Sequence, residues 1–169
     1  MNDRQETGSV AVEGRTTVKR VSELEIAVTR VFDAPARIVF EAWTKPELFM
    51  RWWAPKSMGM TLRSCEMDVR TGGTYRLEFG EDAEHSWAFF GKYLEVVPPS
   101  RLVWTNEENE NDAISTVTFV ENGGKTLLTF SEVYPNKAAF AEGQGGLDAT
   151  PEQFEQLDEL LASLAAGRV

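Results

Sequence analysis

The single histidine of this chain has neighbours of the kind that metal and acid–base sites use. His85 lies in the run GEDAEHS, close to the carboxylates of Glu81, Asp82 and Glu84. A metal site needs several ligands held on a rigid scaffold, whereas this run has the composition of a turn between two strand patterns. We therefore expect a solvated hairpin tip at His85 and predict no metal site.

The single cysteine would need a nearby base to act as a nucleophile. Cys65 lies in the middle of an alternating strand pattern, where a free cysteine is usually inert core, and alone it excludes an internal disulfide and agrees with a reducing compartment. Glu95, Asp68 and Tyr75 are the other candidates for acid–base chemistry. The sequence does not fix which of these three faces the interior, so the catalytic residues remain unknown.

Two further runs are similar in composition to ligand-binding loops. The letters GGKT at 123–126 would form a phosphate loop only with a glycine five positions before Gly124, where Phe119 stands. The acidic run at 107–112 lacks the ligand spacing of a calcium loop. Both are interpreted as turns.

Composition limits the possible partners. The chain has 169 residues, 42% of them apolar, with a formal net charge of -10 and a pI near 4.7. Without a basic stripe, nucleic acid and anionic membrane surfaces are not expected as partners. The polar start MNDRQETGSV is not a signal peptide, and no apolar run approaches the ~20 residues of a membrane span. We expect a cytoplasmic protein without a cofactor.

The first part of the chain predicts a tail, a strand and two short helices. Residues 1–15 are polar and are expected to form a flexible tail, followed by a single domain over 16–169. A long strand is predicted over 17–32, and a helix follows with Asp33 as its cap and Pro35 in its first turn. Thr44 and Glu47 have the spacing of a capping box before a second helix, which Pro55 ends.

The remainder predicts an antiparallel meander and a long helix. Alternating apolar residues recur from 60 to 130, separated by turn signals such as Gly72-Gly73 and Pro98-Pro99. A helix is predicted from Thr150, which forms a capping box with Gln153, and its apolar stripe is formed by Phe154, Leu157, Leu161 and Leu164. The order of elements indicates an α+β fold in which helices are segregated from an antiparallel sheet.

The paired tryptophans of LFMRWWAPKSMGM could either pack in the hydrophobic core or line the wall of an apolar pocket. Neighbouring helical residues lie about 100° apart, so Trp52 and Trp53 cannot face one layer. Plain core is the simpler interpretation of both, but we expect one of them at the end or the entrance of a cavity.

Four motifs resemble a known family in the same order. They are VTRVFDAPARIVFEAWTKPELFMRWWAPK, CEMDVRTGGTYRLEF, LEVVPPSRLVWT and QLDELLASL, and together they span roughly Leu24 to Leu164. The resemblance is to the family named after the C-terminal domain of the activator of the ninety-kilodalton heat-shock protein ATPase. That family is a branch of the START-like, or polyketide-cyclase-like, superfamily. Ala54 replaces a frequent glycine of the family, and residues 136–149 depart from its usual approach to the last helix.

The resemblance implies a helix-grip fold, in which a curved antiparallel sheet is wrapped around the C-terminal helix and two short helices close one end. Related members bind apolar or aromatic molecules between sheet and helix. The ligand-binding residues expected here share an apolar or aromatic side chain at an inward-compatible position; they are Trp52, Trp53, Met67, Tyr75, Leu77, Trp87, Phe89, Trp104, Phe119, Phe154, Leu157 and Leu161.

Three functions are compatible with these features. The leading hypothesis is a binding protein for a small apolar or aromatic ligand, without an assigned reaction. An enzyme of the cyclase or dehydratase kind, using the same cavity, is the first alternative. The second is a chaperone or protein-interaction module with an exposed apolar patch around residues 49–60, although the chaperone-binding N-terminal domain of the eukaryotic activator has no counterpart here and the sequence itself indicates no protein partner.

Overall fold

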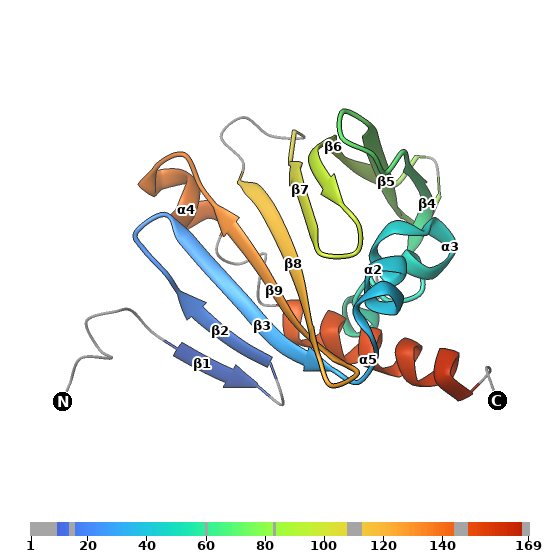
Figure 1. Ribbon diagram of the computed structural model, residues 1–169. Coiled ribbons are helices and arrows are strands. Elements are labelled where there is room, and N and C mark those ends of the chain that lie inside the picture. Colours follow the sequence, from blue (N-terminus) through green and yellow to red (C-terminus); the bar gives the residue numbers. More distant parts are fainter. Residues whose placement is uncertain are drawn as a thin grey trace.

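The computed structural model describes residues 10–13, 16–59, 61–82, 84–107, 113–143 and 149–166. Within these ranges the chain is a curved antiparallel sheet with helices on one side (Figure 1). The strands are β1 (Val10–Glu13), β2 (Thr16–Arg20), β3 (Glu25–Phe32), β4 (Leu62–Met67), β5 (Thr74–Gly80), β6 (Ser86–Val97), β7 (Arg101–Thr105), β8 (Ile114–Asn122) and β9 (Lys125–Val133). The helices are α2 (Ala36–Thr44), α3 (Pro46–Phe49), the 3-10 turn η1 (Lys56–Met58), α4 (Lys137–Gly143) and α5 (Thr150–Ala166).

The nine strands of the described residues form one sheet in the order β1-β2-β3-β9-β8-β7-β6-β5-β4. Consecutive strands pair as the meander predicts, except that β3 pairs with β9, almost a hundred residues later. The predicted α+β helix-grip is therefore confirmed. Helix α3 contacts β4, and α2 contacts β8 and β9, while α5 contacts β3 and α2 (Figure 1).

Strand register separates a concave face, toward the helices, from a convex face. On β3 the alternation places Val28 and Phe32 on the concave side, where both are fully buried, and leaves Val31 exposed on the convex side. The same alternation on β5 buries Tyr75 and Leu77. The burial of Tyr75 and Leu77 agrees with the inward-compatible positions expected for them from the sequence.

Trp43, at the end of α2, is the centre of the core. Its side chain is 2% exposed. Its ring centroid lies between 4.8 and 6.4 Å from those of seven other aromatic residues contributed by the helices and the sheet: Phe49, Trp52, Trp53, Trp104, Phe119, Phe130 and Phe154. Because edge-to-face and offset ring pairs are favourable at these separations, this residue joins α2, the α3 segment, the sheet and α5 into one core.

The strand predicted over 17–32 is wrong in its length. The chain turns at Val21–Leu24, where the N–H of Val21 donates to the carbonyl oxygen of Glu25 at 2.9 Å, and β2 and β3 pair as a hairpin. Ser22 and Glu23 interrupt the apolar alternation at this point, and the interruption is a turn signal. Strand β1 pairs with β2, so the tail boundary predicted at residue 15 is corrected; the rest of the predicted tail lies outside the described residues.

The predicted helix caps are also wrong. Asp33 does not cap α2: its side chain is 76% exposed and lies 3.8 Å from Lys125 Nζ, while the N–H of Ala36 donates to Glu121 Oε1 of β8 at 2.9 Å. Thr44 does not cap α3 either, because its hydroxyl donates back to the carbonyl oxygen of Phe40. Tertiary contacts replace local caps here.

Helix α3 also ends earlier than predicted. It stops at Phe49, and Pro55 instead precedes η1. Trp52 and Trp53 therefore follow the helix in a turn, although Trp53 still stacks on Phe49 at 4.8 Å and 25°.

We predict that Trp43→Ala lowers the free energy of unfolding by about 3–5 kcal/mol, because it removes a large buried side chain and leaves a cavity among the surrounding rings. Urea unfolding followed by circular dichroism measures the loss. Val120→Ala is the control, since Val120 is 58% exposed on the convex face, and should cost less than about 1 kcal/mol. Equal losses from the two substitutions would contradict the central role of Trp43.

Candidate functional site

The helices leave part of the concave face accessible to solvent. The cross-strand pairs Phe79–Trp87 and Leu77–Phe89 place Trp87 and Phe89 of β6 on the concave side, yet these two side chains are 49% and 37% exposed. We call the following residues the apolar concave surface, because each faces inward and is only partly covered: Cys65, Met67, Trp87, Phe89 and Trp104.

Most other predicted site residues lie deeper in the core. Trp52 is fully buried and its indole N–H donates to the carbonyl oxygen of Ala42 at 2.9 Å, so its polar atom is already used. Trp53 is half-buried beside it. The remaining predicted residues are 8% exposed or less and fill the interior around Trp43: Tyr75, Leu77, Phe119, Phe154, Leu157 and Leu161.

A polar row crosses the concave face at the end of β7, β8 and β9. Glu132 Oε2 accepts a hydrogen bond from the Ser115 hydroxyl at 3.1 Å, and Glu132 Oε1 accepts one from the Tyr134 hydroxyl at 2.9 Å. Asn106 Nδ2 donates to Ser115 Oγ at 3.0 Å. The Tyr75 hydroxyl, which donates to the carbonyl oxygen of Thr105 at 2.6 Å, lies beside Asn106. A half-buried carboxylate is thus held at the border of the aromatic core.

Sequence reasoning missed Glu132 although its strand carried a signal. Leu128, Phe130 and Glu132 are two residues apart on β9 and therefore share one face. Extending the apolar alternation by one step would have placed this glutamate inside. Its partners Ser115 and Asn106 come from other strands, and their contact with it follows from strand register, which the sequence did not fix.

Trp43 was also not predicted as a site residue. Its ring is buried, and its indole N–H has no hydrogen-bond partner among the described residues. A buried donor without a partner is uncommon in a folded protein.

Three side chains of α5 form hydrogen bonds with the segment that follows α3. Gln156 Nε2 donates to the carbonyl oxygens of Trp52 and Ala54, and Gln156 Oε1 accepts from the N–H of Lys56. The amide of Gln153, which the sequence placed in a capping box, donates to the carbonyl oxygen of Trp53. Glu152 accepts from Ser57, and these hydrogen bonds lower the pKa of its carboxyl. Ala54 is thus one of the backbone positions through which this segment is fixed against α5.

Two of the three other acid–base candidates face outward. Glu95 pairs with Arg101 at 2.9 Å on the convex side, and its side chain is 46% exposed. Asp68 binds Arg70 at 2.9 Å and is 53% exposed. Tyr75 is the one of the three that faces the interior.

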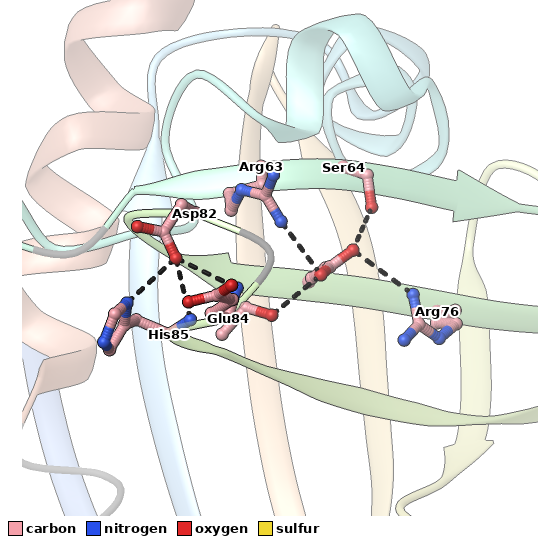
Figure 2. Close-up of polar contacts among 8 residues, drawn as sticks. Arg63, Ser64, Arg76, Asp82, Glu84 and His85 are labelled. Atoms are coloured by element: carbon pink, nitrogen blue, oxygen red, sulfur yellow. Dashed lines mark hydrogen bonds and ion pairs between the residues drawn. The ribbon is translucent and has the colours of Figure 1, made fainter.

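Convex-side charges form a separate network around Glu78. Figure 2 shows Arg63, Ser64 and Arg76 directed at this carboxylate. A hydrogen bond from Ser86, followed by the two guanidinium groups, lowers the pKa of Glu78. The network joins β4, β5 and β6 on the outside of the sheet and does not reach the apolar concave surface.

His85 lies in the β5–β6 turn, as predicted. Its side chain is 70% exposed, and Nδ1 lies 2.9 Å from Asp82 Oδ1 (Figure 2). Hydrogen bonds from His85 lower the pKa of the Asp82 carboxyl. Cys65 instead lies on the concave side of β4, opposite Leu77. Within the described ranges, no group of three or more His, Cys, Asp or Glu side chains is arranged to hold a metal ion.

A groove of about 700 Å³ also opens at β4, β5 and β6. Its lining includes Glu66, Arg76 and Phe90 of the convex side, and also two predicted ligand-binding residues, Met67 and Tyr75. No residue of α5 is among its lining residues. The acidic run at 107–112 lies mostly outside the described residues, and so does the end of the 136–149 segment, from 144 to 148. Within the described part of the chain, no helix is both long and apolar enough to cross a membrane.

Comparison with known proteins identifies the family. The sequence profile described as "Activator of Hsp90 ATPase homolog 1-like protein" matches residues 33–165. The chain belongs to this family. The sequence resemblance is thereby confirmed, and the helix-grip architecture agrees with the START-like superfamily.

Solved structures of several bacterial proteins have a similar fold. A protein from Rhodobacter sphaeroides superposes with a TM-score of 0.79 at 20% identity, covering 88% of this chain and 99% of the other. A protein from Nitrosomonas europaea gives 0.75 at 24% identity, covering 86% and 98%. An AHSA1-like protein from Aeromonas hydrophila gives 0.69 at 18% identity, covering 84% and 94%. A search among curated protein sequences finds no match.

We predict that Cys65 reacts slowly with iodoacetamide. Burial raises the pKa of its thiol to about 11, so the reactive thiolate is scarce at pH 8, and alkylation should be roughly a hundredfold slower than for free cysteine. The rate should rise steadily as the pH approaches 11. Mass spectrometry of the intact protein over time measures alkylation, and the same reaction in urea is the control. A folded-state rate at pH 8 equal to that of free cysteine would contradict the prediction.

Proposed function

We propose that this protein binds a small apolar or aromatic molecule between the concave face of the sheet and α5. The observation that carries the proposal is the exposure of Trp87 and Phe89 on a face that otherwise forms the core. Large apolar side chains exposed together mark interaction sites more often than ordinary surface. On the same face of the sheet, Met67 and Trp104 are also only partly covered.

The chemistry of the concave face supports a ligand of this class. Aromatic walls provide a large apolar contact area, and a few placed polar groups fix a ligand's orientation. Here the aromatic rings come from β6 and β7, and the polar groups are those of the row around Glu132. Among the described residues, the apolar concave surface contains no basic side chain, and the net charge of -10 disfavours anionic ligands.

The segment around the paired tryptophans does not favour the interaction-module alternative. Phe49 is 4% exposed and Trp52 is fully buried. An apolar docking patch at residues 49–60 would require such side chains to face solvent. Their inward packing counts against a protein-docking role for these two side chains.

Native mass spectrometry of the freshly purified protein tests the proposal directly. We expect a complex heavier than the denatured chain by the mass of one small compound, which is released and identified on denaturation. If the chain is purified empty, adding N-phenyl-1-naphthylamine should produce a one-to-one complex. An empty chain that also fails to bind this probe would overturn the proposal.

Phe89→Ala should weaken N-phenyl-1-naphthylamine binding by roughly tenfold, because the substitution removes an aromatic contact from the concave face. Titration followed by probe fluorescence measures the affinity. Phe90→Ala is the matched control, since this neighbouring phenylalanine is 42% exposed on the convex face, and should leave the affinity unchanged. Weaker binding in Phe90→Ala alone would place the probe in the convex groove instead.

A further inference from the structure

The indole N–H of Trp43 is a buried hydrogen-bond donor that has no acceptor among the described residues. We propose that this N–H donates to the ligand, and that the ligand is an aromatic molecule with a neutral acceptor oxygen, such as an aryl ketone. This inference rests on the proposed function above and narrows its class of ligand. It gives a specificity-determining role to the residue at the centre of the core.

The surroundings of Trp43 explain why the chain itself supplies no acceptor. The residue is 2% exposed, and a buried N–H without a partner destabilises a fold. Its neighbours are the seven aromatic rings described above, which belong to phenylalanine and tryptophan alone. Phenylalanine has no polar side-chain atom, and the indole of tryptophan can only donate. An acceptor for this donor therefore has to come from another molecule.

Trp52, in the same cluster, provides the comparison of a satisfied indole. Its ring centroid lies 4.8 Å from that of Trp43, and its own N–H donates to the carbonyl oxygen of Ala42 at 2.9 Å. Two buried indoles in contact thus differ in one respect, because only one of them has a backbone acceptor. A single open donor within an apolar wall is the arrangement that fixes the orientation of a ligand in a binding pocket.

Trp43 lies one ring behind the apolar concave surface. Trp104 belongs to that surface and is only partly covered, and its ring centroid lies 6.0 Å from that of Trp43. Side chains in such positions change rotamer rapidly. A ligand ring that takes the place of the Trp104 indole would therefore bring its substituent to the Trp43 N–H, since packed aromatic rings lie about 5 Å apart.

The donor selects among aromatic ligands by their acceptors. An aromatic ring face accepts a hydrogen bond from an N–H only weakly, so the rings around Trp43 do not replace an oxygen acceptor. A carbonyl oxygen satisfies the donor, whereas a hydrocarbon of the same size leaves it unpaired. A neutral carbonyl also agrees with the net charge of -10, which disfavours a carboxylate ligand.

Nuclear magnetic resonance with two matched naphthalenes tests this assignment in the unmodified protein. 2-Acetylnaphthalene carries a carbonyl oxygen, and 2-isopropylnaphthalene has nearly the same shape without an acceptor. We expect the Trp43 indole proton to resonate further downfield in the acetyl complex than in the isopropyl complex, because a hydrogen bond to oxygen deshields the proton. The Trp52 indole proton is the internal control: its donor is already used, so its signal should be the same in both complexes.

Calorimetric titration of two variants tests the same donor independently. We expect the unmodified protein to bind 2-acetylnaphthalene more tightly than 2-isopropylnaphthalene. Trp43→Phe keeps a ring but removes the N–H, and should shift the ratio of the two affinities roughly tenfold toward the isopropyl compound, because the carbonyl loses its donor. Phe40→Leu is the matched control. Phe40 is 7% exposed and packs on Phe119, so this variant loosens the same core without removing a donor and should keep the ratio.

The results distinguish this inference from the proposed function. If neither naphthalene binds, the proposed function fails and this inference fails with it. If both bind but the Trp43 proton resonates at the same position in the two complexes, only the inference is overturned. A ratio of affinities that Trp43→Phe leaves unchanged, or that Phe40→Leu alters equally, would have the same meaning. If Trp43→Phe does not fold, the signals of the unmodified protein decide.

A buried water is the other molecule that could accept from Trp43. A nuclear Overhauser effect between water and the Trp43 indole proton detects it. We expect this effect to be absent from the acetyl complex, because the carbonyl oxygen occupies the place of the acceptor. A water signal that persists there unchanged would overturn the inference, since the donor would then serve the fold alone.

Discussion

The packing of Trp43 is the interaction on which the rest of the structure depends. A short helix, a turn, three strands and the C-terminal helix all place an aromatic ring against this one indole. The aromatic cluster fills the space between the sheet and the helices around this residue. Toward β6 the helices stop covering the sheet, and the concave face becomes accessible at Phe89. The candidate site thus begins where the core ends.

The fold was largely predictable because its main signals are local. Alternation on β5 identified Tyr75 and Leu77 as inward, and the apolar stripe identified Phe154 and Leu157 as the buried face of α5. The helix caps were predicted wrongly because a residue distant in sequence, rather than a neighbouring one, satisfies the end of the helix. Glu121 caps α2 from β8, which no pattern near the helix could reveal.

The candidate site was less predictable because it depends on register between distant strands. Residue type alone does not identify the site, because Trp87 and Trp52 are both tryptophans, yet Trp87 is exposed and Trp52 is fully buried. Coverage by the helices decides between them, and helix placement follows from contacts such as Gln156 with the turn after α3. The polar row was missed for the same reason, since Glu132, Ser115 and Asn106 become neighbours only after β7, β8 and β9 have paired.

The pairing of β3 with β9 bears on how the protein is made. Val28 and Phe130 lie opposite each other in the sheet although about a hundred residues separate them in the chain. Contacts between such distant segments slow folding, because a long loop must close before they form. During synthesis β3 remains unpaired on this edge until β9 has left the ribosome, and α5 is synthesised after β9. Its apolar concave side is exposed meanwhile, so the nascent chain is most prone to aggregation just before synthesis ends.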